Sequence, residues 1–174
     1  ERELAGRTDV PVYAGCPRPI LRELVTAEEV HGKTGLDGVD LPEPAVGAEE
    51  CHAVDFIIKA CLAAPDGEIT LCPIGPMTNV AVALVMAPEI RRKLREIAFM
   101  GGVALGPGNI TPAAEFNIFA DPHAARIVLE AGVPMTMFGL DVTHKALATP
   151  ARQAAIAAIP TPSARAVVQM LEYY

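Results

Sequence analysis

The stretch Ile69-Thr-Leu-Cys-Pro-Ile-Gly-Pro-Met-Thr-Asn79, with the apolar run that continues to Ala87, decides the fold class. Residues 69–74 are an apolar run of strand length, and the following Gly-Pro pair turns the chain. Residues 77–87 are apolar on nearly all sides, which predicts a deeply buried helix. A strand without polar alternation is typical of a sheet covered on both faces. The stretch therefore predicts one strand-to-helix unit of a parallel sheet.

Similar units are predicted on both sides of this stretch. Besides 69–74, the expected strands are residues 10–14, 97–100 and 133–138. Helices are expected at residues 48–64, 77–87 and 89–95. A further helix is expected to begin at Asp121-Pro122 and run to Ala131, and two more to begin at Thr149-Pro150 and Thr161-Pro162. Residues 16–47 and 103–120 are expected to be long loops. This order predicts an α/β fold with an open, mainly parallel sheet flanked by helices. We expect residues 1–174 to form a single partial domain that is incomplete at both ends.

Composition excludes several classes of protein. With 51% apolar and 20% charged residues the chain is globular rather than disordered. A net charge of −7, only 5% aromatic residues and no Trp argue against nucleic-acid binding. The longest uncharged run is broken by Pro and Gly, so it is a poor membrane span. Four sparse cysteines and no secretory signal suggest reduced thiols and a cytoplasmic location.

The strongest candidate for chemistry is Gly108-Asn-Ile-Thr-Pro-Ala-Ala-Glu-Phe-Asn117. It places Asn109, Glu115 and Asn117 within nine residues, after a strand end, where ligands bind in parallel sheets. One carboxylate and two amides can accept from and donate to several hydroxyls, which suits a sugar ring. Alternatively, Asn109 stabilises a turn and Asn117 caps a helix. Glu115 has apolar neighbours, so its carboxylate needs a partner in either case.

The other polar motifs give weaker evidence for a functional site. His31 lies in a Gly-rich loop, where it either contacts a ligand or is simply solvated. The adjacent Gly32-Lys-Thr lacks the upstream glycine, the strand and the helix of a phosphate-binding loop. Asp141 and His144 could serve as metal ligands, but the sequence offers no third ligand beside them, which disfavours a metal site. The sequence has no Gly-x-Ser-x-Gly and no Gly-x-Gly-x-x-Gly, which disfavours an α/β-hydrolase and a dinucleotide-binding protein.

Six blocks of the sequence resemble, in the same order, the inosine–uridine preferring nucleoside hydrolases. They are Pro11-Val-Tyr-Ala-Gly15, His31-Gly-Lys-Thr-Gly-Leu36, Cys72-Pro-Ile-Gly-Pro-Met-Thr-Asn79, Phe99-Met-Gly-Gly102, the stretch from Gly108 to Asn117 with Asp121-Pro122, and Gly139-Leu-Asp-Val-Thr143. The resemblance implies a Rossmann-like nucleoside hydrolase fold. It also implies hydrolysis of the N-glycosidic bond of purine and pyrimidine ribonucleosides to ribose and free base.

The resemblance also implies a cofactor and partners. The family holds Ca²⁺ deep in its pocket, where the ion binds the ribose 2′- and 3′-hydroxyls and a water molecule, and hard Ca²⁺ takes oxygen ligands. The partner is a small ribonucleoside, with no nucleic acid or membrane, and the complete protein is expected to be a homo-oligomer, either a dimer or a tetramer. By resemblance, Asn117 serves the ring hydroxyls near the metal, and Glu115 and Asn109 hold the 5′ side.

Five further positions take roles by resemblance. Met100 corresponds to the residue that packs beneath the sugar, and Phe116 to a wall of the pocket. The backbone carbonyl of Ile74 corresponds to the one main-chain calcium ligand. His31 corresponds to a pocket histidine near the base, and Asp141 belongs to a stretch that supports the site structurally.

Two family motifs are absent from the sequence. One is the amino-terminal Asp-Thr-Asp-Pro-Gly-x-Asp-Asp, which supplies most calcium ligands and the general base, and the other is a late His-Asp pair. No catalytic residue is therefore assigned in this chain. We expect the chain alone to be inactive and to hold one half of a site, with activity in the parent protein. The alternative is a non-catalytic α/β module that binds a sugar or a protein.

Overall fold

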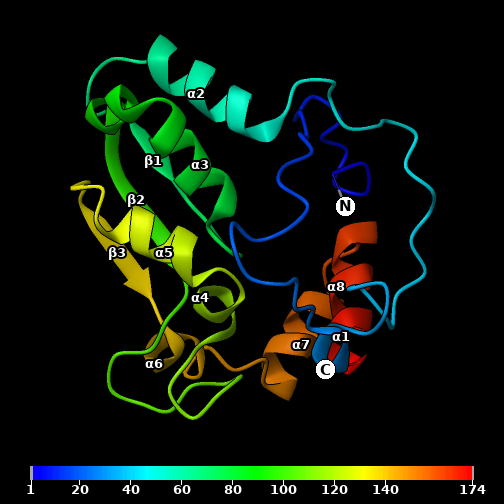
Figure 1. Cartoon of the computed structure of the whole chain (residues 1–174). Helices are drawn as coiled ribbons and strands as arrows, with labels where there is room; N and C mark the ends of the chain where they lie inside the picture. The colour runs from blue at the N-terminus through cyan, green and yellow to red at the C-terminus, as the bar shows by residue number, and fades with distance from the viewer. Residues whose placement is uncertain (1, 174) are drawn as a thin grey trace. The chain divides into compact units, whose positions relative to one another are not determined.

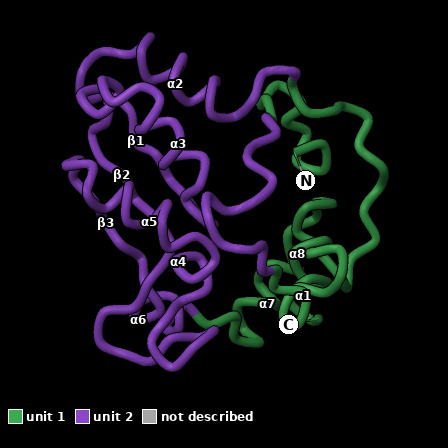
Figure 2. Tube along the Cα trace, in the orientation of Figure 1, with its two compact units in different colours: residues 1–12, 26–49, 147–174 green, residues 13–25, 50–146 purple. Residues whose placement is uncertain are grey.

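The structure is a computed structural model that describes residues 2–173. The described chain forms two compact units (Figure 2): unit 2 contains residues 13–25 and 50–146, and the other described residues form unit 1. Unit 1 holds three helices, α1 (Glu28–His31), α7 (Pro150–Ala157) and α8 (Pro162–Tyr173). The single partial domain stays a prediction.

Unit 2 is built on a parallel three-stranded sheet (Figure 1). Its strands are β1 (Ile69–Leu71), β2 (Leu94–Met100) and β3 (Met135–Phe138), in the order β1-β2-β3. In the register of β2 and β3, Ile97 lies opposite Met135 and Met100 opposite Phe138, so the two strands end together. The expected α/β fold with an open parallel sheet flanked by helices is confirmed.

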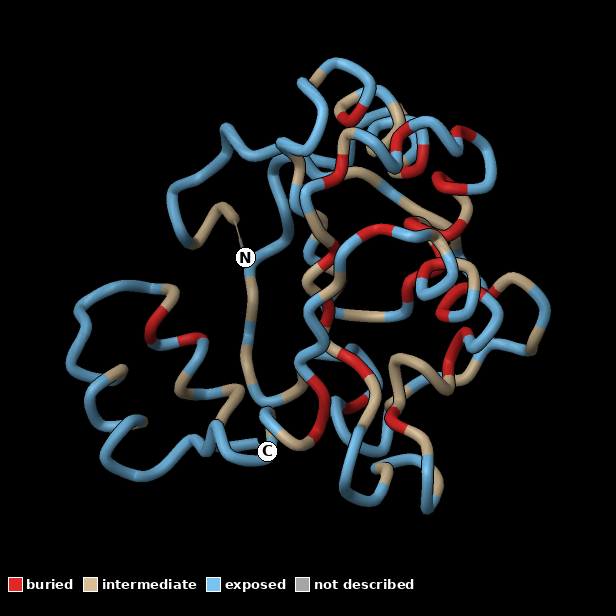
Figure 3. The backbone as a smooth tube through the Cα atoms, turned by 90° about the vertical axis from the view of Figure 1, so that its left-hand side faces the viewer, coloured by how far each residue is buried: buried red, intermediate tan, exposed pale blue. Residues whose placement is uncertain are grey.

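The remaining elements of unit 2 are α2 (Ala53–Ala63), α3 (Thr78–Met86), the 3₁₀ helix η1 (Pro88–Lys93), α4 (Phe116–Ala120), α5 (Pro122–Leu129) and α6 (Leu140–Thr143). Helix α3 packs against both α5 and α2. The core between helices and sheet includes Ile90, Ile97 and Val128, which are fully buried. Burying each such side chain contributes about 1.5–3 kcal/mol. Nearly all buried residues belong to unit 2 (Figure 3).

The expected strand at residues 10–14 is wrong. Only Tyr13 has bridge geometry, and Glu49 N donates to Val12 O at this point. Val10 and Val12 are both exposed, because no neighbouring strand within residues 2–173 covers them. A β-branched run forms a strand only where a partner strand satisfies its backbone groups.

Several element boundaries also differ from the expectations. The first long helix begins at Ala53 rather than 48, because His52 Nδ1 accepts from Val54 N and caps it. Strand β1 ends at Leu71, and the carbonyl of Pro73 then accepts from Met100 N. Strands β2 and β3 begin at Leu94 and Met135, the basic segment is a 3₁₀ helix, and α1, α4 and α6 lie in segments without an expected helix.

The helix starts at acid-Pro and Thr-Pro pairs are confirmed. The side chain of Asp121 accepts from Ala124 N at 3.0 Å, and Thr149 and Thr161 accept from the N–H three residues on. Among residues 2–173 no helix has the length and apolarity that a bilayer crossing requires.

Candidate functional site

The candidate site lies where β2 ends, at Gly101-Gly102. The N–H of Gly102 donates to Glu115 Oε2 at 2.9 Å, and its carbonyl accepts from Leu140 N at 2.9 Å. Gly102 has φ +75°, and a Cβ there would lie 3.1 Å from Met137 Sδ, so this position requires glycine. One residue thus joins the end of β2 to α4 and α6.

Glu115 is the N-cap of α4 and is only 2% exposed to solvent. Besides the Gly102 bond, the carboxylate accepts from Asn117 N at 3.0 and 2.9 Å and from Ile118 N at 3.3 Å. The partner that the sequence demanded for this buried carboxylate is therefore main-chain N–H. Oε2 takes three of the bonds and Oε1 takes one, so Oε1 keeps acceptor capacity.

The two asparagine side chains have amide orientations that their partners fix. Asn117 Nδ2 donates to Met100 O at 3.0 Å and approaches Met100 Sδ at 3.1 Å, so Oδ1 is directed away from these acceptors. Asn109 Oδ1 accepts from Phe116 N at 2.9 Å, which leaves its Nδ2 as a donor. The pair therefore presents one acceptor and one donor from opposite ends of the same loop.

The loop before α4 is closed tightly around one carbonyl. Ala114 O accepts from Asn109 N at 3.1 Å and from Ile110 N at 3.2 Å. A Cβ on Gly108 would lie 2.2 Å from Ala114 O, so glycine permits this approach. Asn109 does stabilise a turn, as the alternative held, while the helix cap is Glu115 rather than Asn117. In this arrangement Asn109 still keeps its Nδ2 donor and Asn117 its Oδ1 acceptor.

The other positions chosen from the sequence belong to different elements of the two units. Met100 and Phe116 are half-buried and contact the Asn109–Asn117 pair through the bonds above. Ile74 lies beyond β1 with its residue 84% exposed, beside an open cavity of about 260 Å³ that Asn79 also lines. His31 is the last residue of α1 and belongs to unit 1.

Asp141 supports the neighbouring loop. Its carboxylate accepts from Ala104 N at 2.7 Å and Leu105 N at 3.0 Å. These two main-chain hydrogen bonds, that of Ala104 first, hold the pKa of the Asp141 carboxyl below its ordinary value. The side chain thus has the structural role that the resemblance gave it.

The residues that sequence reasoning missed are Asp121, Thr78 and Asn79. Asp121 was recognised only as a helix cap, yet Thr78 Oγ1 donates to it at 2.7 Å and Ile20 N at 3.0 Å. Asn79 Oδ1 accepts from Cys16 N at 2.8 Å. The Asp-Pro pair signalled the cap, but no local pattern signals partners that lie 43 and 101 residues away.

The described residues do not fit a calcium ion by themselves. Within residues 2–173 no group of three or more His, Cys, Asp and Glu side chains could hold a metal. Asp121 is buried and engaged by three donors, and the Ile74 carbonyl is a single ligand. Calcium takes six to eight oxygen ligands, which these residues do not assemble.

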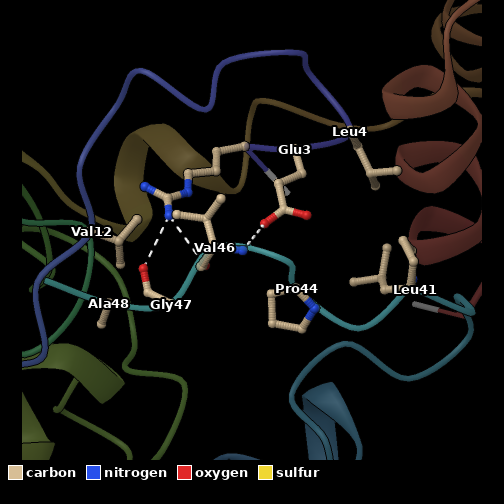
Figure 4. Close-up of a pocket in the computed structure, with 10 residues that line it drawn as sticks. Glu3, Leu4, Val12, Leu41, Pro44, Val46, Gly47 and Ala48 are labelled. Atoms are coloured by element: carbon tan, nitrogen blue, oxygen red, sulfur yellow. Dashed lines mark hydrogen bonds between the residues drawn. The ribbon is translucent and has the colours of Figure 1, made fainter.

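A second cavity lies within unit 1 (Figure 4). It has a volume of about 520 Å³ and a mainly apolar lining that includes Val12, Leu41 and Val46. Arg2 donates to the carbonyls of Val46 and Gly47, and the carboxylate of Glu3 accepts from Val46 N and Ala45 N, which lower its pKa. Both charged side chains are thus engaged by the main chain.

Comparison with known proteins decides the family. The family model described as inosine-uridine preferring nucleoside hydrolase matches residues 2–174. The chain belongs to this family. Among curated nucleoside hydrolases, the chain is 54% identical to the pyrimidine-specific ribonucleoside hydrolase RihB of Escherichia coli over 142 residues, which are 82% of this chain and 45% of RihB.

Solved nucleoside hydrolases share the fold. The structure of a purine-preferring ribonucleoside hydrolase from Gardnerella vaginalis superposes with a TM-score of 0.92 at 34% identity, covering 99% of this chain and 56% of that protein. A plant nucleoside hydrolase gives a TM-score of 0.91 at 31% identity, covering 99% and 55%. The chain therefore spans about half the length of the nucleoside hydrolases it matches.

Proposed function

We propose that this chain supplies the ribose-holding part of a ribonucleoside hydrolase, which cleaves the N-glycosidic bond to give ribose and a free base. The observation that carries the proposal is the fixed amide pair at the strand ends. Asn117 keeps an acceptor oxygen and Asn109 keeps a donor nitrogen, and neither can rotate without losing a main-chain partner. Membership of the nucleoside hydrolase family supports the same conclusion.

Each residue has a part in holding the sugar. Ribose hydroxyls both donate and accept, so one hydroxyl can donate to Asn117 Oδ1 and another can accept from Asn109 Nδ2. Glu115 orients both amides through α4 and has acceptor capacity left on Oε1. Met100 and Phe116 offer apolar surface to the faces of the ring.

Calcium dependence is part of the proposal for the complete protein only. Residues 2–173 assemble no calcium site, so the acids that hold the ion and the base that activates water must come from other residues, with the Ile74 carbonyl as one ligand. We also propose a cytoplasmic homo-oligomer, a dimer or a tetramer, as the working form.

A pyrimidine nucleoside is the first substrate to test. The 54% identity to RihB, whose name is pyrimidine-specific, exceeds the 34% identity to the purine-preferring enzyme. Uridine and inosine should therefore be compared directly, with uridine cleaved faster.

The test is ribose release by the complete product of the gene that encodes this chain, from uridine and from inosine, with and without a calcium chelator. We expect release that the chelator abolishes. Asn117→Ala should raise KM about 3- to 10-fold through loss of one hydrogen bond, whereas the control Gln153→Ala on α7 should leave KM unchanged. No ribose from either nucleoside, or equal KM for the two variants, would contradict the proposal.

The second candidate is a non-catalytic module that binds a sugar. The lack of a metal-binding acid cluster among residues 2–173 favours it for the chain taken alone. Titration of the complete protein with ribose separates the two: saturable binding that depends on Asn117, without turnover of any nucleoside, would establish the binding module.

A further inference from the structure

Asp121 has a buried carboxylate that the proposed sugar contacts do not use. The residue is 0% exposed, and its donors are all uncharged: Ile20 N and Thr78 Oγ1 bond to Oδ2, and Ala124 N bonds to Oδ1. Among residues 2–173 no Lys, Arg or His forms an ion pair with it. The Ala124 bond alone would suffice for a helix cap. The other two bonds therefore serve something besides capping.

These bonds connect three parts of unit 2 that are far apart in sequence. Ile20 lies in segment 13–25, Thr78 is the first residue of α3, and Asp121 itself is the single residue between α4 and α5. A buried carboxyl group is costly unless its hydrogen-bond donors hold their positions, so the three parts are fixed relative to one another.

Helix α4, which carries Asn117, is consequently held at both ends. Glu115 ties its start to Gly102 at the end of β2, and Asp121 ties its end to α3 and segment 13–25. The guanidinium of Arg22 adds a contact, because it lies 4.0 Å from the centre of the Phe119 ring and donates to the Phe119 carbonyl. A helix of five residues is not stable alone, so these contacts decide where it lies.

The start of α3 is fixed in the same way. Asn79 follows Thr78 and accepts from Cys16 N, and a Cβ on Gly15 would lie 2.5 Å from Asn79 Oδ1. Asn79 also lines the cavity beside Ile74. The end of β1 and the end of α4 are therefore linked through the neighbouring residues Thr78 and Asn79.

We propose that Asp121 is a positioning residue that fixes Asn117 relative to the carboxyl end of β1, where Ile74 lies. The inference rests on the proposed function, because it concerns the geometry of the same sugar site. Asp121 acts through α4 and through Thr78, and it touches no atom of the sugar.

Two variants of the complete protein test the proposal. In Asp121→Asn the amide oxygen can accept from only one of the two main-chain donors, Ile20 N and Ala124 N, so one bond is lost at constant shape. Thr78→Val removes the hydroxyl donor and leaves the carboxylate in place, and Thr78→Ser restores the donor. Val128→Ala is the matched control, because it weakens the core of α5 without touching the carboxylate.

We expect Asp121→Asn and Thr78→Val to raise KM for uridine about tenfold, with kcat changed less than about twofold. Thr78→Ser should keep KM within about twofold of wild type. Val128→Ala should lower Tm about as much as Asp121→Asn does, and it should leave KM for uridine unchanged. Equal KM for Asp121→Asn and Val128→Ala at matched loss of Tm, or equal KM for both Thr78 variants, would overturn the proposal. If Asp121→Asn does not fold, the Thr78 pair decides.

Hydrogen exchange separates this inference from the proposed function. Residues 16–22 and 116–120 should exchange faster in Asp121→Asn and Thr78→Val than in Val128→Ala. If wild-type protein releases no ribose, the proposed function fails, and exchange alone then decides: faster exchange in those two segments supports the positioning role, and exchange equal to that of Val128→Ala overturns it.

Discussion

Replacing Glu115 by Ala should cost far more stability than removing an exposed carboxylate. The side chain accepts from three main-chain N–H donors, those of Gly102, Asn117 and Ile118. Each lost bond is worth about 1 kcal/mol, since water can re-solvate some of the freed donors. The expected loss is therefore about 3 kcal/mol in the free energy of unfolding. Glu115→Gln should lose about 1–2 kcal/mol, because its amide nitrogen cannot accept from any of these donors.

The assay is urea unfolding of the purified protein, with Glu130→Ala as the matched control. Glu130 is exposed and pairs with Arg126 across one helical turn at 2.9 Å, so its loss should cost less than about 0.5 kcal/mol. A Glu115→Ala variant as stable as Glu130→Ala, with weakened ribose binding, would refute the capping argument. It would show instead that the carboxylate serves the ligand alone.

Three further changes have defined outcomes. Gly102→Ala should lower the free energy of unfolding by about 1–2 kcal/mol, because φ is positive there and the methyl group meets Met137; urea unfolding checks it, and an unchanged midpoint would contradict it. Val128→Ala should lower the free energy of unfolding by about 2 kcal/mol, because it leaves a cavity in the core. Urea unfolding measures this loss too, and a loss below about 0.5 kcal/mol would show that the surrounding core collapses into the cavity. Because the pKa of Asp141 is lowered in the folded state, its contribution is present above the unfolded pKa near 3.9 and is lost as pH falls through the folded value. The amide NMR signals of Ala104 and Leu105 should therefore shift below about pH 4, and in Asp141→Asn they should lack this step; a step that persists in the variant would assign the titration to another group.

The fold was predictable where local signals and burial agree. The apolar run 69–74, the turn after it and the buried helix to Ala87 identified β1 and α3, and the Asp-Pro and Thr-Pro pairs located three helix starts. The strand expected at 10–14 failed because strand formation depends on a partner that local sequence does not show. Helix α4 was hidden because five residues give too short a period to detect.

The site residues chosen from the sequence stay a prediction, and the hydrogen bonds between them depend on the tertiary fold. The need of Glu115 for a partner followed from its apolar neighbours, whereas the identity of that partner, the main chain at Gly102, depends on how β2 meets α4. The link from Asp121 to Ile20 spans 101 residues and leaves no mark on either segment alone.

The fixing of α4 at both ends restricts how the protein can vary in length. Each residue added to an α-helix turns everything after it by about 100° and advances it by about 1.5 Å. With Glu115 and Asp121 both anchored, one inserted or deleted residue between them would swing either Asn117 or a capping acid out of reach. Insertions and deletions should therefore be excluded between these two acids.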